Sequence, residues 1–521
     1  MLFWLTAVAL VIAISLGGGT HDGFLGDFFA QLLAVALLTF CGWKLLAAKT
    51  IRLRAFAVPL SLVILFVLIL VLQLTPLPQD LWSRIGANLI SPSGQIVPGI
   101  EGVSTVNAST AEGWHALSLS PHATWASAVS LLVPLAIFCA VAQLDARSRL
   151  RLCWLILGLG GIALVLGLLQ IAQGPQSNLR FFAFTNTSDA VGFFANRNHF
   201  AAQLYVTLVF AAVWFASMAR ASSRPGAFAT HMAFWFATTI ALLIAIIAGL
   251  AMARSRAGVI LAVVAIFGIV AMIFASQRAT PEDRANKNLG DRKFGLGRVA
   301  LVTLGFAVVF AAQFGLHRIQ SRFGSDPLED LRIPLSATTL ETAISAMPFG
   351  TGLGSFVPVY ATVEKTDDIF SGFANRAHND FAEFLLEAGI PSGLLMLIFL
   401  SWFALRVYAI WFSKPDDPRA VSRDQLMLSR AGTLVVMLLL AHSLVDYPLR
   451  TTALAALFAF SCAVLIPPAQ TTSDGNNPKR NEADTSDGTP SPADNHKTQP
   501  LKPQRWGADI TWPDAWQSDQ R

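Results

Sequence analysis

Long apolar segments alternate with short polar segments along the first 466 residues. Uncharged runs such as Val58–Leu74 and Leu152–Ile171 are long enough to cross a hydrocarbon core of about 30 Å. Apolar runs bounded by charged or Pro/Gly-rich breaks predict about twelve membrane-spanning helices. They are expected near residues 2–16, 28–46, 56–74, 123–142, 152–171, 199–218, 231–252, 257–275, 299–316, 388–412, 431–446 and 450–466.

Composition agrees with a membrane protein. The chain is 54% apolar and 13% charged, whereas a soluble domain carries roughly 25% charged residues. We therefore predict an all-α polytopic membrane protein, with residues 1–467 as one membrane domain. No basic residue precedes the run at 2–16, so we expect a retained first helix there rather than a signal peptide.

Basic residues gather in every second loop between the predicted spans. They are Lys44, Lys49, Arg52 and Arg54, then Arg147, Arg149 and Arg151, then Arg220 and Arg224, then the basic segments 276–298 and 413–430. The loop at 17–27 carries acids and no Lys or Arg. Because basic loops stay in the cytoplasm, both termini are expected there, in a bacterial inner membrane. Segments 75–122, 172–198 and 317–387 then face the periplasm. The net charge of +5 follows from these loops and does not indicate nucleic-acid binding.

The last segment, 468–521, has a different composition. It is rich in Pro, Asn, Asp, Lys, Thr and Ser and has few aliphatic residues, so we expect a disordered cytoplasmic tail. Its Trp506, Trp512 and Trp516 are open to two interpretations, a docking motif for an unknown partner or residues without a role.

Two arginines stand where the predicted topology disfavours positive charge. Arg254 and Arg256 lie between two apolar spans at the expected periplasmic end. An arginine pushed toward the bilayer centre costs about 2.5–3.5 kcal/mol on insertion scales. The two guanidiniums could reach the outer lipid phosphates, or they could clamp a diphosphate through charge-assisted hydrogen bonds. We favour the clamp.

Further polar residues gather at the other expected periplasmic breaks. Asn196, Arg197, Asn198 and His199 form a polar turn at the start of one span, and a helix cap and a site remain alternatives. Asp446 and Arg450, with His442, lie between the last two spans, where Asp446 is either a cap or a site residue.

The large segment 317–387 combines Arg332, a glycine-rich turn and a group of titratable residues. Backbone amides of the turn at 348–354 could approach a ligand closely. His378, Glu383 and Glu387 fall near one face of a predicted helix, which suggests general-base chemistry or a metal site. Metal is the weaker interpretation because no HExxH spacing is present. The four cysteines lie in apolar runs without metal or disulfide spacing.

Four motifs in order resemble the O-antigen ligase / O-antigen polymerase family. The strongest is 378–393, a His-Asn pair followed by spaced acids and glycines, and the others are 194–199, 255–258 and 348–356. The resemblance covers roughly residues 190–450. It implies a C-type glycosyltransferase-like fold with a large helical periplasmic loop at 317–387.

The resemblance also implies a chemistry. An undecaprenyl-diphosphate-linked glycan would be transferred to a hydroxyl of a glycan, lipid A-core or protein acceptor, with inversion and without a metal or cofactor. Arg254, Arg256, Arg332 and, by a looser match, Arg376 would bind the diphosphate. His378 would orient or deprotonate the acceptor hydroxyl, and Glu383 is the second candidate catalytic residue.

The residues support this chemistry independently of the resemblance. Guanidiniums can stabilise a departing diphosphate, and a histidine can accept a proton near neutrality. Ligase and polymerase activities remain open alternatives. A secondary transporter or polysaccharide flippase would place charge near the bilayer midplane, whereas here the polar clusters lie at the outer ends. A cell-wall synthase of the shape-and-division type is a nearer alternative.

Overall fold

The computed structural model describes residues 1–20, 25–47, 53–85, 114–222, 229–276, 332–364, 374–412 and 422–468. All of them belong to the first of the two units of the chain, Met1–Thr471. The predicted span at 299–316 and the predicted tail at 468–521 lie outside the described residues, apart from Pro468.

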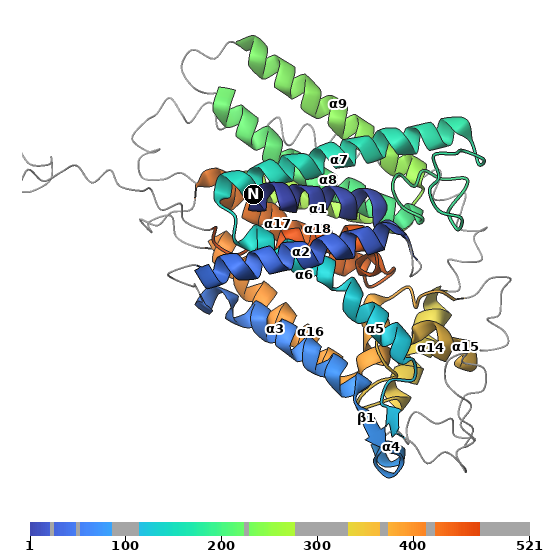
Figure 1. Ribbon diagram of the computed structural model, residues 1–521. Helices are drawn as coiled ribbons and strands as arrows, with labels where there is room; N and C mark the ends of the chain where they lie inside the picture. Colours follow the sequence, from blue (N-terminus) through green and yellow to red (C-terminus); the bar gives the residue numbers. More distant parts are fainter. Residues whose placement is uncertain are drawn as a thin grey trace, which may run out of the picture. The chain divides into compact units, whose positions relative to one another are not determined.

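Helices account for most of the described chain (Figure 1). The long ones are α1 (Leu2–Leu16), α2 (Leu25–Ala47), α3 (Leu53–Leu74), α5 (Pro121–Ser130), α6 (Leu132–Ala142), α7 (Ala146–Gln173), α8 (Arg197–Ser222), α9 (Ala229–Ala253), α10 (Arg256–Ser276), α16 (Asp380–Phe412), α17 (Arg423–His442) and α18 (Thr452–Ala463). The shorter ones are α4 (Gln79–Ile85), α14 (Arg332–Ser345), α15 (Phe356–Val363) and η3 (Pro448–Arg450). Two short antiparallel strands, β1 (Pro76–Pro78) and β2 (Trp114–Ala116), pair with Pro76 opposite Ala116 and are an exception to the predicted all-α fold.

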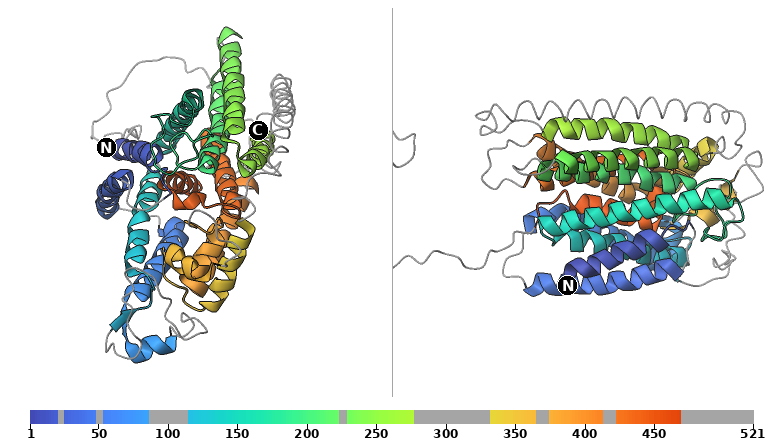
Figure 2. Two further views of the ribbon diagram at one scale, coloured as in Figure 1. Left: turned by 90° about the vertical axis from the view of Figure 1, so that its right-hand side faces the viewer. Right: turned by 90° about the horizontal axis from the view of Figure 1, so that it is seen from above.

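Eight of the described helices are long and apolar enough to cross a membrane, and three shorter apolar helices join them. The long helices lie side by side with their axes roughly aligned (Figure 2). Every predicted span within the described residues overlaps a helix, so the prediction of an all-α polytopic membrane protein is confirmed at this level.

The predicted boundaries of the span at 431–446 were wrong, whereas those of the last span agree with α18 to within three residues. The span expected at 431–446 is α17, which begins at Arg423 and ends at His442, and the span expected at 450–466 is α18. The polar start of α17 is helical and buried because its side chains find partners. The Gln425 amide donates to Ser429 Oγ (3.2 Å), and the Arg430 guanidinium stacks on Trp411 at 5.5 Å.

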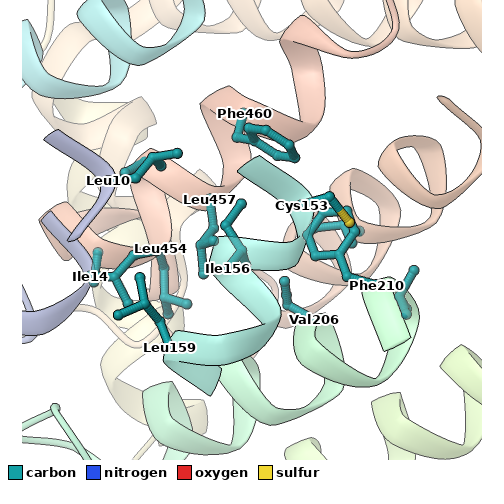
Figure 3. Close-up of a cluster of buried hydrophobic side chains, with 14 of the residues drawn as sticks. Leu10, Ile14, Cys153, Ile156, Leu159, Val206, Phe210, Leu454, Leu457 and Phe460 are labelled. Carbon is teal, nitrogen blue, oxygen red and sulfur yellow. The ribbon is translucent and has the colours of Figure 1, made fainter. Parts of the chain in front are cut away.

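The core is built around α18, a short helix that is apolar on nearly every face, as expected for a buried helix. Its Leu454, Leu457 and Phe460 are fully buried. They lie among side chains of α1, α7 and α8 (Figure 3). α18 is thus enclosed by protein rather than by lipid.

Small residues allow the helices around this core to approach closely. A Cβ atom added to Gly258 at the start of α10 would lie 2.4 Å from the Ala201 side chain on α8. One added to Gly160 on α7 would lie 2.1 Å from Thr207 Oγ1, also on α8. Close backbone packing at small residues is the usual basis of helix association in membranes.

One end of the bundle is held together by buried Arg149. Its guanidinium donates to Val141 O (3.0 Å), Ala142 O (2.9 Å) and Ile466 O (2.6 Å). Val141 and Ala142 end α6, and Ile466 follows α18, so the cation lies where the partial negative charge of two helix C-termini gathers. Arg149 therefore ties α6, α7 and the segment after α18 together.

The opposite end of the bundle collects the candidate site residues. Backbone hydrogen bonds join segments that are distant in sequence: Ala453 N donates to Gly17 O (2.9 Å), and Asp380 N donates to Ser443 O (2.9 Å). α14, α15 and the segment after α7 lie toward this end as well (right in Figure 1).

We expect Arg149→Met to lower the free energy of unfolding by roughly 2–4 kcal/mol, because three buried carbonyl groups lose a charged donor. Buried Cys153 and Cys462 permit thermal unfolding in detergent to be followed with a thiol-reactive fluorophore. Arg151→Met, at an exposed position of the same helix, is the matched control. Equal unfolding temperatures for the two variants would contradict the role of Arg149.

Candidate active site

A buried carboxylate, Asp446, lies at the centre of the site end. Asp446 Oδ1 is 3.1 Å from His378 Nδ1, and Oδ2 accepts a hydrogen bond from Asn198 Nδ2 (2.6 Å). Arg332 Nη2 is 3.9 Å from the same Oδ2. These four residues, Asn198, Arg332, His378 and Asp446, form what we name the Asp446 cluster. It joins the start of α8, the start of α14, the residues before α16 and the turn after α17.

Two aromatic side chains complete this cluster. His199 is fully buried, and its Nε2 lies 4.0 Å from Asp446 Oδ1. The Tyr447 ring packs edge-on between His199 and His378, with centroids 4.9 and 5.0 Å away. Both Asn196 Nδ2 and Asn375 Nδ2 lie 3.4 Å from the Tyr447 hydroxyl. The predicted polar turn 196–199 and the predicted turn 442–450 therefore meet in space.

Charge and burial set the protonation of the two central groups. Burial alone would raise the pKa of Asp446, but Arg332 and the hydrogen bond and charge of His378, with His199, together hold it well below its ordinary value of 3.8. Burial and the nearby Asp446 charge raise the pKa of Tyr447 to about 12. Asp446 is therefore an ionised carboxylate beside a neutral phenol at physiological pH.

His378 is presented by an unusual backbone conformation. Its φ is +51°, in the left-handed region that histidine enters more readily than most residues. The next residue, Asn379, caps α16: its Oδ1 accepts from Phe381 N and Ala382 N, both at 3.1 Å. The chain reverses at His378 and enters the capped helix, and the imidazole stays in contact with Asp446.

A second group of charges, which we name the Arg450 cluster, consists of Arg376, Asp380, Glu383, Glu387 and Arg450. Arg450 Nη2 is 3.0 Å from Glu387 Oε2 and 3.5 Å from Glu383 Oε1, and Nε is 3.6 Å from Asp380 Oδ1. Burial by itself would lower the pKa of Arg450, but these three carboxylates outweigh it, and the net pKa is raised. One cation thus ties η3 to three successive turns of α16.

The structure places Glu383 and Arg376 in this ion-paired cluster. Arg376 Nη1 is 3.1 Å from Glu383 Oε1, and Glu383 Oε2 accepts from Ala377 N (2.9 Å). Glu383 thus contacts two cations, Arg376 and Arg450, and a backbone amide. These contacts favour an anchoring role for the pair, and the predicted catalytic role of Glu383 remains an untested prediction.

Arg254 lies in a third group of charges with an acid that the sequence did not single out. Its Nη1 is 3.4 Å from Asp189 Oδ1, while Arg197 Nη1 is 2.8 Å from Asp189 Oδ2. Arg254 has a φ of +52° and fills the tight reversal between α9 and α10. Ser255 then caps α10, with its Oγ accepting from Gly258 N (3.0 Å). Arg256, the first residue of α10, is half-buried at the same reversal.

The glycine-rich turn has a structural role that differs from the expected one. Four successive amides donate within the protein: Gly350 N to Ala346 O, Thr351 N to Leu386 O and Gly352 N to Glu387 O, all at 2.9 Å, and Leu353 N to Gln73 Oε1 at 3.0 Å. These amides are therefore not directed at a ligand. The turn instead packs on α16 where Gly389, with a φ of +57°, interrupts the helix.

Several residues of the site end were missed in the sequence. Asp189 and Tyr447 were not among the predicted site residues, and Asp380 was noted only as part of the motif at 378–393. The one available signal for Asp189 was its position as the single acid in the expected outward segment 172–198, which also contains Arg180 and Arg197. Within the described part of the chain, no group of three or more His, Cys, Asp or Glu side chains has a metal-binding arrangement, and metal-independent chemistry stays a prediction.

The fold and the site define a multi-pass helical membrane protein with buried charged side chains gathered at one end of the bundle. Residues 240–398 match the family model described as O-antigen ligase. This match supports the family resemblance of the motifs at 255–258, 348–356 and 378–393 and associates the chain with polysaccharide biosynthesis, whereas the motif at 194–199 lies outside it. The match includes Arg254, Arg256, Arg332, His378 and Glu383, whereas Asp446 and Asn196 lie outside it. No curated protein matches the chain.

We expect Asp446→Asn to lower the unfolding temperature near neutral pH, by the equivalent of about 1–3 kcal/mol, because charged hydrogen bonds are lost. The pKa of Asp446 is lower in the folded chain than its ordinary value of 3.8. Its ionised contacts therefore stabilise the fold above that pH, and the contribution is lost as the pH falls below it. Tryptophan fluorescence unfolding from pH 7 to pH 3 should show the difference between the two proteins begin to narrow below about pH 4. A constant difference would contradict this linkage.

Proposed function

We propose that this protein is a membrane glycosyltransferase. It transfers a glycan from an undecaprenyl-diphosphate carrier to an acceptor hydroxyl at the periplasmic face of the inner membrane. The observation that supports this most directly is the Asp446 cluster, in which one carboxylate contacts both His378 and Arg332. A candidate base and a candidate cation for the leaving group thus lie side by side at the site end.

His378 has the geometry of a general base. Its Nδ1 faces ionised Asp446 at 3.1 Å, which leaves Nε2 for the acceptor. In the same arrangement of other enzymes, the carboxylate sets the tautomer of the imidazole and stabilises the imidazolium that forms. The His378 side chain is 20% exposed, so an acceptor hydroxyl can reach it. Asp446 acts here as a positioning residue.

The reaction is a single displacement at the anomeric carbon. The acceptor hydroxyl gives its proton to His378 Nε2, and its oxygen attacks the carbon from the face opposite the diphosphate. The bond from that carbon to the diphosphate oxygen breaks, and the electron pair leaves with the diphosphate. This course inverts the anomeric centre and needs no metal if guanidiniums stabilise the leaving charge.

Arg254, Arg256 and Arg332 supply the guanidiniums in this proposal. Arg254 and Arg332 keep partly exposed side chains, 34% and 23%, whereas Arg376 is 11% exposed and paired with Glu383. We therefore assign the diphosphate to the first three and an anchoring role to Arg376. All of them lie at helix ends, and this placement favours an enzyme over a transporter with charges near the midplane.

Backbone strain gives independent support. Arg254 and His378 are the non-glycine residues with positive φ in the described chain. This conformation costs an L-residue roughly 1–2 kcal/mol, and glycine or asparagine would adopt it more easily. Strained residues of this kind cluster at functional sites. Both strained positions are occupied by proposed site residues, which fits a requirement for the arginine and histidine side chains there.

We expect His378→Asn to reduce transfer by about 10²–10⁴-fold, the usual contribution of a general base. Asparagine tolerates positive φ, so the variant should fold and should still bind donor. Transfer and donor binding are measured on the purified protein in detergent. Asn379→Asp, which retains a capping oxygen next to the changed position, is the control for a local backbone effect. Wild-type turnover in His378→Asn would exclude the imidazole as the base.

A deletion strain examined on a glycan gel distinguishes the two activities. Accumulation of long chains on the lipid carrier indicates a ligase, which passes finished glycan to lipid A-core or protein. Accumulation of single repeat units indicates a polymerase. An unchanged glycan profile would contradict the enzyme proposal, as would reporter fusions that place residues 317–387 in the cytoplasm.

A further inference from the structure

Asp189 joins two arginines that differ in their freedom to move. Asp189 is 1% exposed and Arg197 is 8% exposed, and their contact of 2.8 Å is short. The other oxygen of the Asp189 carboxylate lies 3.4 Å from Arg254 Nη1, and the Arg254 side chain is 34% exposed. The Asp189–Arg197 pair is therefore a fixed part of the fold, whereas the contact with Arg254 is long, partly solvated and easily exchanged.

The backbone around Asp189 is held so that its carboxylate cannot follow Arg254. Arg180 Nη1 donates to Asn186 O (2.7 Å) and to Asp189 O (2.9 Å). Ala190 N donates to Met252 O (3.2 Å), which ties the segment to the last turn of α9. Further along, Gln170 Oε1 accepts from Val191 N and Gly192 N. None of these bonds involves the Arg254 side chain, so the position of the Asp189 backbone does not depend on it.

Three guanidiniums lie beside Asp189. Arg197 and Arg254 contact its carboxylate, and Arg180 donates to its backbone carbonyl. Burial lowers the pKa of Arg180, and Asp189 counteracts this shift. A diphosphate, with two or more negative charges, competes well with a single carboxylate for an exposed guanidinium.

We propose that Asp189 is an exchangeable counter-ion of the anion site. It holds Arg254 while the site is empty, yields it to the diphosphate of the donor, and takes it back as the product leaves. The inference rests on the proposed function, because the anion is the donor's diphosphate group.

The exchange of Arg254 between Asp189 and the diphosphate would assist release of the product. The donor diphosphate is esterified at both ends, whereas the product, undecaprenyl diphosphate, has a free terminal phosphate whose further ionisation occurs near pH 6, as in other phosphate monoesters. The product is thus more anionic than the donor and would bind the same guanidiniums more tightly. A fixed carboxylate that competes for Arg254 weakens product binding and favours turnover.

The test measures inhibition of glycan transfer by inorganic pyrophosphate on the full-length protein. Asp189→Asn should bind pyrophosphate about two- to fivefold more tightly, the range expected for loss of a partly exposed ion pair. Because Asp189→Asn also removes the carboxylate that contacts buried Arg197, the double variant Asp189→Asn/Arg197→Gln replaces this ion pair by an uncharged hydrogen bond. It should show the same tightening if the single variant fails to fold.

Two controls isolate the exchange. In an Arg254→Gly background, where transfer itself is impaired, pyrophosphate binding is measured directly, and the Asp189 substitution should no longer change it. Asp145→Asn changes an acid at the other end of α7, where it caps the helix, and should leave inhibition unchanged. Unchanged or weaker pyrophosphate binding in both Asp189 variants would overturn the counter-ion role. If the wild-type protein transfers no glycan, the proposed function fails. If it transfers glycan but pyrophosphate does not inhibit it, the anion site and the counter-ion role fail while the transferase function stands.

Discussion

A charge taken out of water at the end of an apolar helix bundle needs a partner of opposite sign, and this constraint organises the site end of the protein. Asp446 is enclosed by His378, Arg332 and Asn198, and Arg450 is enclosed by three carboxylates. Each pairing joins segments that are far apart in sequence. The ion pairs that neutralise the buried charges therefore also assemble the site.

The contacts of the charged side chains divide into fixed and exchangeable ones. Arg149 and the Arg197–Asp189 pair are buried and tightly hydrogen-bonded, so they belong to the scaffold. The contacts of Arg254 and Arg332 with carboxylates are longer, at 3.4 and 3.9 Å, and their side chains are partly exposed. A guanidinium in such a contact can turn toward an entering anion without leaving a deeply buried carboxylate wholly unpaired.

Backbone geometry supports the same division. Amides of the glycine-rich turn donate hydrogen bonds to α16 and Gln73. They thereby support the interrupted helix that carries Asp380, Glu383 and Glu387. The left-handed residues of the described chain that are not glycine are His378 and Arg254, directly beside helix starts. The glycines thus shape the support, and the strained positions carry the side chains proposed to react.

The sequence alone determined the membrane class, the approximate spans and the family, because apolar length and local motifs are properties of contiguous residues. It also indicated His378, Arg254 and the turn at 442–450. Only the tertiary structure decided the partners: Asp189 with Arg254, Tyr447 between two imidazoles, Glu383 with Arg376, and the amides of the glycine-rich turn with α16. Helix periodicity gives the face on which a side chain lies, but the opposite charge comes from a helix elsewhere in the chain, so packing alone determines which charges meet.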